Sequence, residues 1–406
     1  MSNDTQPEIR FPGFTEDWEE RKLSNMTQYK NGKGNEDRQV ESGKLELVNL
    51  NSISIDGGLK YSGKFVDEAD ETLMKDDLVM ILSDVGHGDL LGRVALIPED
   101  NRFVLNQRVA LLRTNETANP KFLFSYINAH QYYFKSQGAG MSQLNISKGS
   151  VENFTGFVPS LSEQKQIGNF FKQLDDTIAL QQRKLDLLKE TKKGFLQKMF
   201  PKNGAKVPEI RFPGFTGDWE QRKLGDVLTV SKEKNKSNSY SKEQILSVSR
   251  EVGTVNQIEY QGRSFAGADI SGYKIVYPGQ LIYTKSPLKG APYGIFQLVT
   301  EEGIVSPLYA VYNSTEQALA SFIGLQLKSD NIATHYLSPL VSKGAKNTIN
   351  ITDEGALDGR VTYPTITEQQ KIVAFFKQLE NTITLHQRKL DLLKETKKGF
   401  LQKMFV

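Results

Sequence analysis

The chain has 406 residues, 38% of them hydrophobic and 24% charged, which is typical of globular proteins and allows two domains of about 150 residues each. The net charge of +3 is too small to favour nucleic-acid binding through a general electrostatic field, and the lack of cysteine excludes disulfides and thiolate metal sites. No apolar run approaches the roughly 18 residues of a membrane span, and residues 1–12 contain no signal-peptide core, so we expect a cytoplasmic protein without membrane contact.

A motif near the start of the chain returns in its second half. Residues 8–23 read EIRFPGFTEDWEERKL, and residues 209–224 read EIRFPGFTGDWEQRKL. We interpret Trp18 and Trp219 as core residues that join each domain to its long helix, with base stacking as the alternative.

Residues 1–161 predict a first domain of mixed α/β type. Runs rich in β-forming residues and broken by Gly and Asp predict its strands, and a helix-like stretch follows them. The strands are expected at 45–55, 77–82 and 103–113, and the helix at 121–134.

Residues 162–200 predict one long helix. Apolar residues from Ile167 to Met199 recur at spacings of three, four and seven along a single heptad seam, interrupted by Gln181 and Lys192. Ser162 is the predicted N-cap. A helix of about 37 residues would be about 55 Å long, and a single apolar stripe of that length needs a partner.

A linker and a second domain follow. Residues 201–215 contain the Pro and Gly residues of a connecting segment. Residues 216–366 repeat the order of the first domain without repeating its sequence, which predicts a second α/β domain. Its strands are expected at 245–252, 280–285 and 303–313, and its helix at 317–328.

Residues 367–406 predict the partner helix, because residues 387–405 repeat residues 182–200 without a change. Thr367 is its predicted N-cap, and His386 and Lys397 interrupt its seam. The repeated motifs and helices are nearly identical, whereas the two domains between them differ in sequence. This indicates two different surfaces on one scaffold with pseudo-two-fold symmetry. The residues expected in the coil are Phe171, Leu174, Ile178, Leu185 and Leu188 in the first helix and Phe376, Leu379, Ile383, Leu390 and Leu393 in the second.

The duplicated order resembles the DNA-specificity subunit of type I restriction-modification systems over essentially the whole chain. The motifs that carry the resemblance are W-E-x-R-K-L at Trp18 and Trp219, and S/T-E-Q-x-x-I at Ser162 and Thr367. The resemblance implies an α+β fold in which two globular α/β target recognition domains are separated by two long antiparallel coiled-coil helices, with a pseudo-two-fold internal repeat.

The resemblance also implies a function. Each variable domain would read one half of a bipartite, asymmetric double-stranded DNA target. The helices would fix the spacer and dock two modification subunits. Cleavage would belong to motor-nuclease restriction subunits that join through the complex.

Two glycine-containing loops recur at matching places in the two domains. The first loop spans 83–93 and 285–294, and the second spans 137–148 and 342–351. Glycine lets backbone approach phosphate closely, and basic and amide side chains can bond phosphates or base edges. An ordinary glycine-rich hairpin is the alternative for the first loop, and a solvated connector is the alternative for the second.

Another candidate contact is the segment 29–34, which could equally be a mobile surface turn. Gln107 and Arg108 are expected within a strand, where an exposed polar pair could face a groove of the DNA; ordinary outward polar residues of a strand are the alternative. The predicted DNA-binding residues are Lys30, Lys33, His87, Arg93, Gln107, Arg108, Asn145, Lys148, Lys285, Ser286, Lys289, Tyr293, Lys346 and Asn347.

Motifs of catalysis are missing from the sequence. We find no phosphate-binding P-loop, no Asn-Pro-Pro-Tyr-like methyltransferase motif and no metal-ligand spacing among the four histidines. We therefore expect a non-catalytic subunit without cofactor or metal. Two other interpretations stay open: a coiled-coil interaction scaffold whose two domains bind a non-DNA ligand, and a self-contained enzyme with an unrecognised site.

Overall fold

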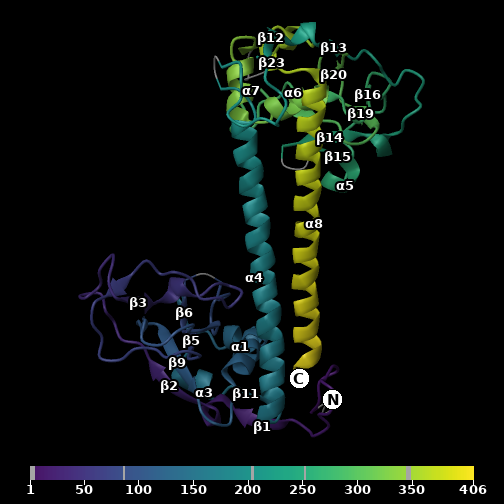
Figure 1. Cartoon of the computed structure of the whole chain (residues 1–406). Coiled ribbons are helices and arrows are strands. Elements are labelled where there is room, and N and C mark those ends of the chain that lie inside the picture. The colour runs from purple at the N-terminus through teal and green to yellow at the C-terminus, as the bar shows by residue number, and fades with distance from the viewer. Residues whose placement is uncertain (1–4, 86, 203–204, 251–252, 344–348) are drawn as a thin grey trace. The chain divides into compact units, whose positions relative to one another are not determined.

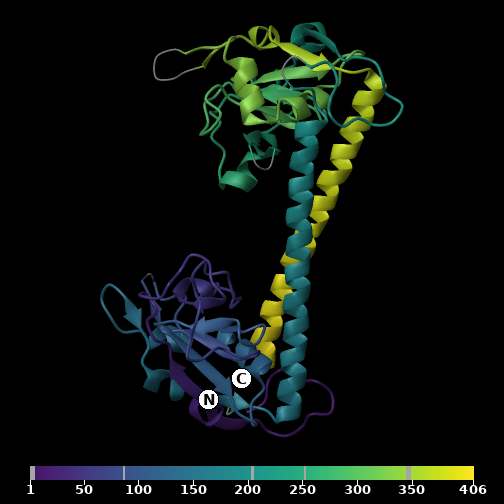
Figure 2. The same ribbon diagram turned by 60° about the vertical axis from the view of Figure 1, so that its left-hand side comes forward.

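The computed structural model describes residues 5–85, 87–202, 205–250, 253–343 and 349–406. Internal contacts divide the chain into two compact units, residues 1–184 with 386–406 (unit 1) and residues 185–385 (unit 2). Each unit contains one variable domain and part of both long helices, α4 at Leu161–Lys198 and α8 at Ile366–Met404 (Figures 1 and 2).

The domain of unit 1 is built on an antiparallel sheet in the order β2-β9-β5-β7. Its central strand β5 has the continuous apolar sequence LVMI and is buried throughout. Leu78 and Met80 face the core beneath α1 and α2, whereas Val79 and Ile81 face a second core, as the two-residue period of a strand requires. The strands are β1 (Glu19–Lys22), β2 (Thr27–Asn31), β3 (Leu45–Val48), β4 (Phe65–Val66), β5 (Leu78–Ile81), β6 (Ser83–Asp84), β7 (Val94–Leu96), β8 (Phe103–Leu105), β9 (Val109–Thr114), β10 (Leu144–Asn145) and β11 (Thr155–Val158), and the helices are α1 (Pro120–Ala129), α2 (Gln131–Ser136) and α3 (Lys148–Glu152).

The domain of unit 2 repeats this plan with the sheet order β13-β20-β17-β18. Leu281 and Tyr283 of its central strand face the core that includes Phe322 of α6, and Ile282 faces the opposite core. The strands are β12 (Glu220–Lys223), β13 (Leu228–Val230), β14 (Leu246–Ser249), β15 (Gly253–Asn256), β16 (Lys274–Val276), β17 (Leu281–Tyr283), β18 (Phe296–Leu298), β19 (Gly303–Val305), β20 (Ala310–Ser314), β21 (Ser342–Lys343), β22 (Ile349–Asn350) and β23 (Arg360–Tyr363), and the helices are α5 (Gln257–Gln261), α6 (Ala320–Gln326) and α7 (Asp330–Leu337).

The strand expected at 103–113 is two strands, so the placement of Gln107 and Arg108 within a strand was wrong. They form the turn between β8 and β9, where Arg108 has a φ of 65°. The polar pair stands between two apolar runs and lies exposed, which favours a turn at that point. The strand expected at 303–313 is interrupted in the same way, by a turn between β19 and β20.

The predicted N-caps of the long helices were also wrong. The helices begin at Leu161 and Ile366, so Ser162 and Thr367 lie inside the first turn. Ser160 and Thr365 precede the helices, and their carbonyl oxygens accept hydrogen bonds from the backbone of Gln164 and Gln369.

The repeated motifs form the same clamp in each unit, where the domain meets the start of its long helix. Arg10 donates two hydrogen bonds of 2.7 and 2.8 Å to the carboxylate of Glu163, and Arg211 donates two of 2.7 Å to Glu368. Both glutamates are fully buried. These planar, charge-assisted pairs fix the orientation of the helix as well as its position.

The neighbouring tryptophans and glutamines complete this junction. Trp18 and Trp219 are 2% exposed and pack in the cores that include Phe171 and Phe376 of the long helices, which confirms their interpretation as core residues. The Gln164 side chain accepts from the backbone N–H of Asn119 at 2.9 Å. In unit 2, Gln369 makes the matching bond to Leu319 at 2.9 Å.

We expect Glu163→Ala to lower the free energy of unfolding of unit 1 by about 3–5 kcal/mol, because Arg10 would keep a largely buried charge without a partner. Trp18 fluorescence during urea unfolding, measured in a Trp219→Phe background, reports unit 1 alone because the chain has two tryptophans. The control is Glu19→Ala, which breaks an exposed pair with Arg21 and should cost at most about 1 kcal/mol. Equal small losses in both variants would show that the clamp is dispensable.

In unit 1 the two long helices pair antiparallel. The rings of Phe171 and Phe405 stack with centroids 5.4 Å apart, and Asp175 pairs with Lys397 at 2.6 Å. The side chains of Gln181 and His386 lie 3.1 Å apart, so these two of the four polar interruptions are partners. Burial raises the pKa of Asp175, and Lys397 opposes this shift.

Unit 2 contains the equivalent pairs of the duplicated helices. Lys192 pairs with Glu380, and the rings of Phe200 and Phe376 stack with centroids 6.4 Å apart. The protein is therefore a mixed α and β fold with two domains of one plan and two long helices that pair antiparallel.

Candidate nucleic-acid interface

The two glycine-containing loops of unit 1 meet, although they are far apart in sequence. Strand β6 of the first loop pairs antiparallel with β10 of the second, which brings Ser83 opposite Asn145. The Ser83 hydroxyl donates to Asn145 Oδ1 at 2.5 Å, and Asn145 Nδ2 donates to the Gln143 carbonyl at 3.1 Å. The loops therefore form one combined surface.

Two glycines of these loops occupy positions where a side chain would not fit. Gly92 has a φ of 72°, and a Cβ atom there would lie 2.3 Å from Phe134 Cβ. Gly140 has a φ of 138°, and a Cβ atom there would lie 2.0 Å from the Gln143 carbonyl oxygen. Any other residue would strain the backbone at both positions.

The charged candidates of the first loop differ in exposure. His87 is exposed on the loop. Arg93 is half-buried and donates to the carbonyl of Asn128 in α1 at 3.2 Å, and desolvation lowers its pKa. Arg93 therefore lies against its own domain, whereas His87 is open to a ligand.

Lys148 lies on the same part of unit 1, at the start of α3. Its ammonium group is 5.5 Å from the centroid of the Tyr29 ring and 3.5 Å from the Glu152 carboxylate. Burial raises the pKa of Tyr29 to about 12, so this phenol stays neutral and can donate a hydrogen bond. Tyr29 donates to Asn31 Oδ1 at 2.5 Å.

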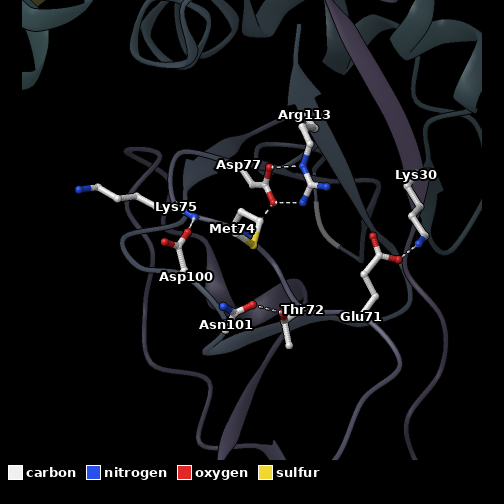
Figure 3. A network of polar contacts seen from close by, with 9 residues as sticks. All are labelled: Lys30, Glu71, Thr72, Met74, Lys75, Asp77, Asp100, Asn101 and Arg113. Atoms are coloured by element: carbon white, nitrogen blue, oxygen red, sulfur yellow. Dashed lines mark hydrogen bonds and ion pairs between the residues drawn. The ribbon is translucent and has the colours of Figure 1, made fainter.

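The remaining candidates of unit 1 lie among acidic side chains. Lys30 pairs with Glu71, and Gln107 donates to Glu36. Figure 3 shows Lys30 beside a network in which Arg113 binds Asp77 through bonds of 2.8 and 2.7 Å. Lys33 and Arg108 are exposed near these groups. A phosphate would have to displace the acidic partners of Lys30 and Gln107.

In unit 2 an ion pair ties the first loop to Asp353, two residues beyond the second loop. Lys285 follows strand β17 with a φ of 50° and donates to Asp353 Oδ1 at 2.6 Å. Lys274 pairs with the other carboxylate oxygen of Asp353. Partial burial would raise the pKa of Asp353, but the hydrogen bonds from Lys274 and Lys285 hold it below its ordinary value.

Lys289 is an exposed cation of this surface. It stands in a tight turn closed by two backbone hydrogen bonds of 3.0 and 2.9 Å between Leu288 and Ala291. Ser286 is half-buried, and the Tyr293 carbonyl accepts from the Tyr283 hydroxyl at 2.6 Å. The predicted residues Lys346 and Asn347 lie outside the described residues.

Three residues of these surfaces are not among those predicted from the sequence. Asp353 holds both Lys274 and Lys285, and no motif marks it. Val85 and Met141 are strongly exposed apolar residues of the two loops of unit 1. The signal that could have identified Val85 and Met141 is an apolar residue within a glycine-rich loop. Apolar groups exposed in this way can contact thymine methyls or wedge between bases.

The described residues contain no group of three or more His, Cys, Asp or Glu side chains placed to hold a metal ion. In the part of the chain that the structure describes, no helix combines the length and apolar character that crossing a membrane requires.

The two domains share one plan, and each is clamped to a long helix and presents its own pair of loops. This architecture is typical of a binding protein with two internal repeats. The chain belongs to the family described as type I restriction modification DNA specificity domain, which matches residues 15–190 and again 216–395. Its function therefore lies in DNA sequence specificity within a restriction and modification system.

Known relatives have the same description. The specificity subunit named for the type I restriction enzyme MjaX of Methanocaldococcus jannaschii is 23% identical over 95% of this chain and 92% of its own length. The MjaVIII specificity subunit of the same organism is 24% identical over 53% of this chain and 50% of its own. The crystal structure of a type I S subunit from M. genitalium shares the fold, with a TM-score of 0.63 over 99% of both chains at 14% identity.

Proposed function

We propose that this chain reads a bipartite, asymmetric double-stranded DNA target, with one half-site for residues 1–161 and the other for residues 216–366. The observation that carries the proposal is the contrast between scaffold and loops. The Arg10–Glu163 and Arg211–Glu368 clamps are the same in both units, whereas the contacts made by the first loop differ. Ser83 bonds Asn145 of the second loop in unit 1, and Lys285 pairs with Asp353, just beyond the second loop, in unit 2. The two domains are attached to the long helices in the same way but present different side chains on their loops. This arrangement suits the recognition of two different DNA sequences.

We further propose that the paired helices set the spacer and dock two modification subunits. Each helix carries exposed leucines one heptad apart, Leu180 and Leu187 in α4 and Leu385 and Leu392 in α8, outside the seam that pairs the helices. Apolar residues exposed at helical spacing on both copies suit an interface with partner helices. In this proposal the chain itself is non-catalytic: methyl transfer belongs to the modification subunits, and cleavage belongs to restriction subunits that join the complex.

An exchange of one domain tests the proposal. Replacing residues 24–159 by the variable segment of a relative, in cells that also express the modification subunits, should change one half of the methylated target. Sequencing of methylated sites measures both halves at once. If both halves change, the domains do not read independently. Retention of the original target would show that this segment does not read DNA.

Lys289→Ala should weaken DNA binding because Lys289 is exposed on the loop surface of unit 2. The slope of log affinity against log salt should fall by about 0.9 for each phosphate that the variant no longer neutralises. Fluorescence anisotropy with a labelled duplex over a range of salt measures both quantities. Lys377→Ala, at an exposed position of α8, is the control and should change neither. If the Lys289 variant matches this control, that loop does not contact DNA.

A further inference from the structure

Unit 2 contains a cleft of about 1150 Å³ that none of the predicted DNA-binding residues lines. Its walls are the last turns of α4, the segment from Leu325 through α7, and strand β23, which lie together in Figure 1. The volume exceeds the roughly 300–1,000 Å³ that is usual for small-molecule sites.

The described side chains that line the cleft carry positive charge and no carboxylate. They come from separate elements, so the fold and not a local run of sequence gathers them. The basic lining residues are Lys192, Lys193, Lys198, Lys202, Lys328, His335 and Arg360. Such a gathering repels itself unless an anion neutralises it.

Carboxylates outside the lining neutralise only part of this charge. Lys192 pairs with Glu380, and Lys202 pairs with Glu209. No described carboxylate lies within ion-pair distance of Lys193, Lys328 or Arg360. Desolvation by burial is the main cause that lowers the pKa of Lys328; the neighbouring Lys192 adds to this shift and Glu380 opposes it.

The lining is apolar between these charges. Leu196, Leu325, Ile332 and Val361 contribute to it, and Ile332 is 43% exposed. Contacts to the phosphates of a DNA duplex would use the cations but would leave these apolar groups unused. Apolar groups surrounded by polar and charged ones are instead the pattern of a protein–protein interface.

We propose that this cleft docks an acidic segment of a partner protein in which carboxylates are interspersed with apolar side chains. The carboxylates meet Lys193, Lys328 and Arg360, and the apolar groups cover Leu196 and Ile332. The proposal goes beyond DNA recognition and does not depend on it.

The test uses the full chain and a fluorescein-labelled peptide of three Glu-Glu-Leu repeats, with binding followed by anisotropy. The chain should bind this peptide and should not bind a peptide of Gln-Gln-Leu repeats. Combined Lys193→Glu, Lys328→Glu and Arg360→Glu should weaken binding at least about tenfold, since all three positions are exposed and face the ligand. The triple alanine variant should weaken binding in the same direction.

The control reverses the same number of charges in unit 2, by Lys232→Glu, Lys234→Glu and Lys236→Glu at exposed positions outside the cleft. It should keep the affinity of the unaltered chain. Equal weakening in both reversed variants, or no binding by the unaltered chain, would overturn the proposal. Displacement of the peptide by equimolar tripolyphosphate or duplex DNA would also overturn it, because the cleft would then be a phosphate site.

Discussion

Leu185→Asp combined with Leu390→Asp should abolish the pairing of the long helices and, with it, assembly with modification subunits. Each leucine is 1% exposed in the heptad seam. Removing a buried leucine side chain costs about 2–5 kcal/mol, and a buried carboxylate without a partner adds several more. The combined cost is comparable with the whole stability of a typical domain, about 5–15 kcal/mol. Thermal unfolding by circular dichroism and size-exclusion chromatography with the modification subunits measure the two effects.

The chain offers a matched control in the same two helices. Leu187 and Leu392 are each 68% exposed, so replacing both by Asp should leave the melting temperature nearly unchanged. The same control variant tests the docking proposal, because loss of assembly without loss of folding would place the partner on this face. A Leu185 and Leu390 variant that melts and assembles normally would show that the helices do not pair through this seam.

Lengthening both helices by one heptad should stop modification of the original target and favour a target with a longer spacer. Seven helical residues add about 10.5 Å, which is about three base pairs at roughly 3.4 Å per pair. Duplicating residues 180–186 and 385–391 keeps the seam in phase, because a whole heptad is added at the same level of the antiparallel pair. Sequencing of methylated sites gives the spacer directly.

The lengthened protein should also bind more weakly. Three base pairs turn the second half-site by nearly one third of the roughly 10.5-pair helical turn, whereas a heptad shifts the coil by only about 20°. A heptad added to α4 alone is the control, and it should abolish activity because one helix then slides past the other. A doubly lengthened variant that keeps its original spacer would refute the role of the helices as a ruler.

The structure decides where such a change can be made. The end of α4 looks suitable in the sequence because a Pro- and Gly-containing linker follows it. Met199 and Phe200 are nevertheless buried in the core of unit 2, at 3% and 5% exposure. An insertion there would displace core residues or be absorbed by the linker, so the helix centres are the better position.

The sequence by itself determined the features that depend on local periodicity and on repetition. The heptad spacing from Ile167 to Met199 predicted a long helix with one apolar face, and its identical copy predicted the partner. Gln181 and His386 interrupt the two apolar seams at matching positions, and the structure places their side chains in contact. Such patterns suffice because a residue on a helix shares a face with residues only three, four or seven positions away.

The tertiary structure alone decided which distant residues meet. Glu163 lies 153 positions from the arginine that neutralises it, Asp353 lies 68 positions from Lys285, and Ser83 lies 62 positions from Asn145. The sequence marked Lys285 as a cation near DNA but carried no sign that Asp353 would hold it. It also placed Arg108 in a strand, although the chain turns there. The charge and polarity of a residue can be read from the sequence. Its interaction partner depends on the sheet order and on the antiparallel helices, which bring distant parts of the chain into contact.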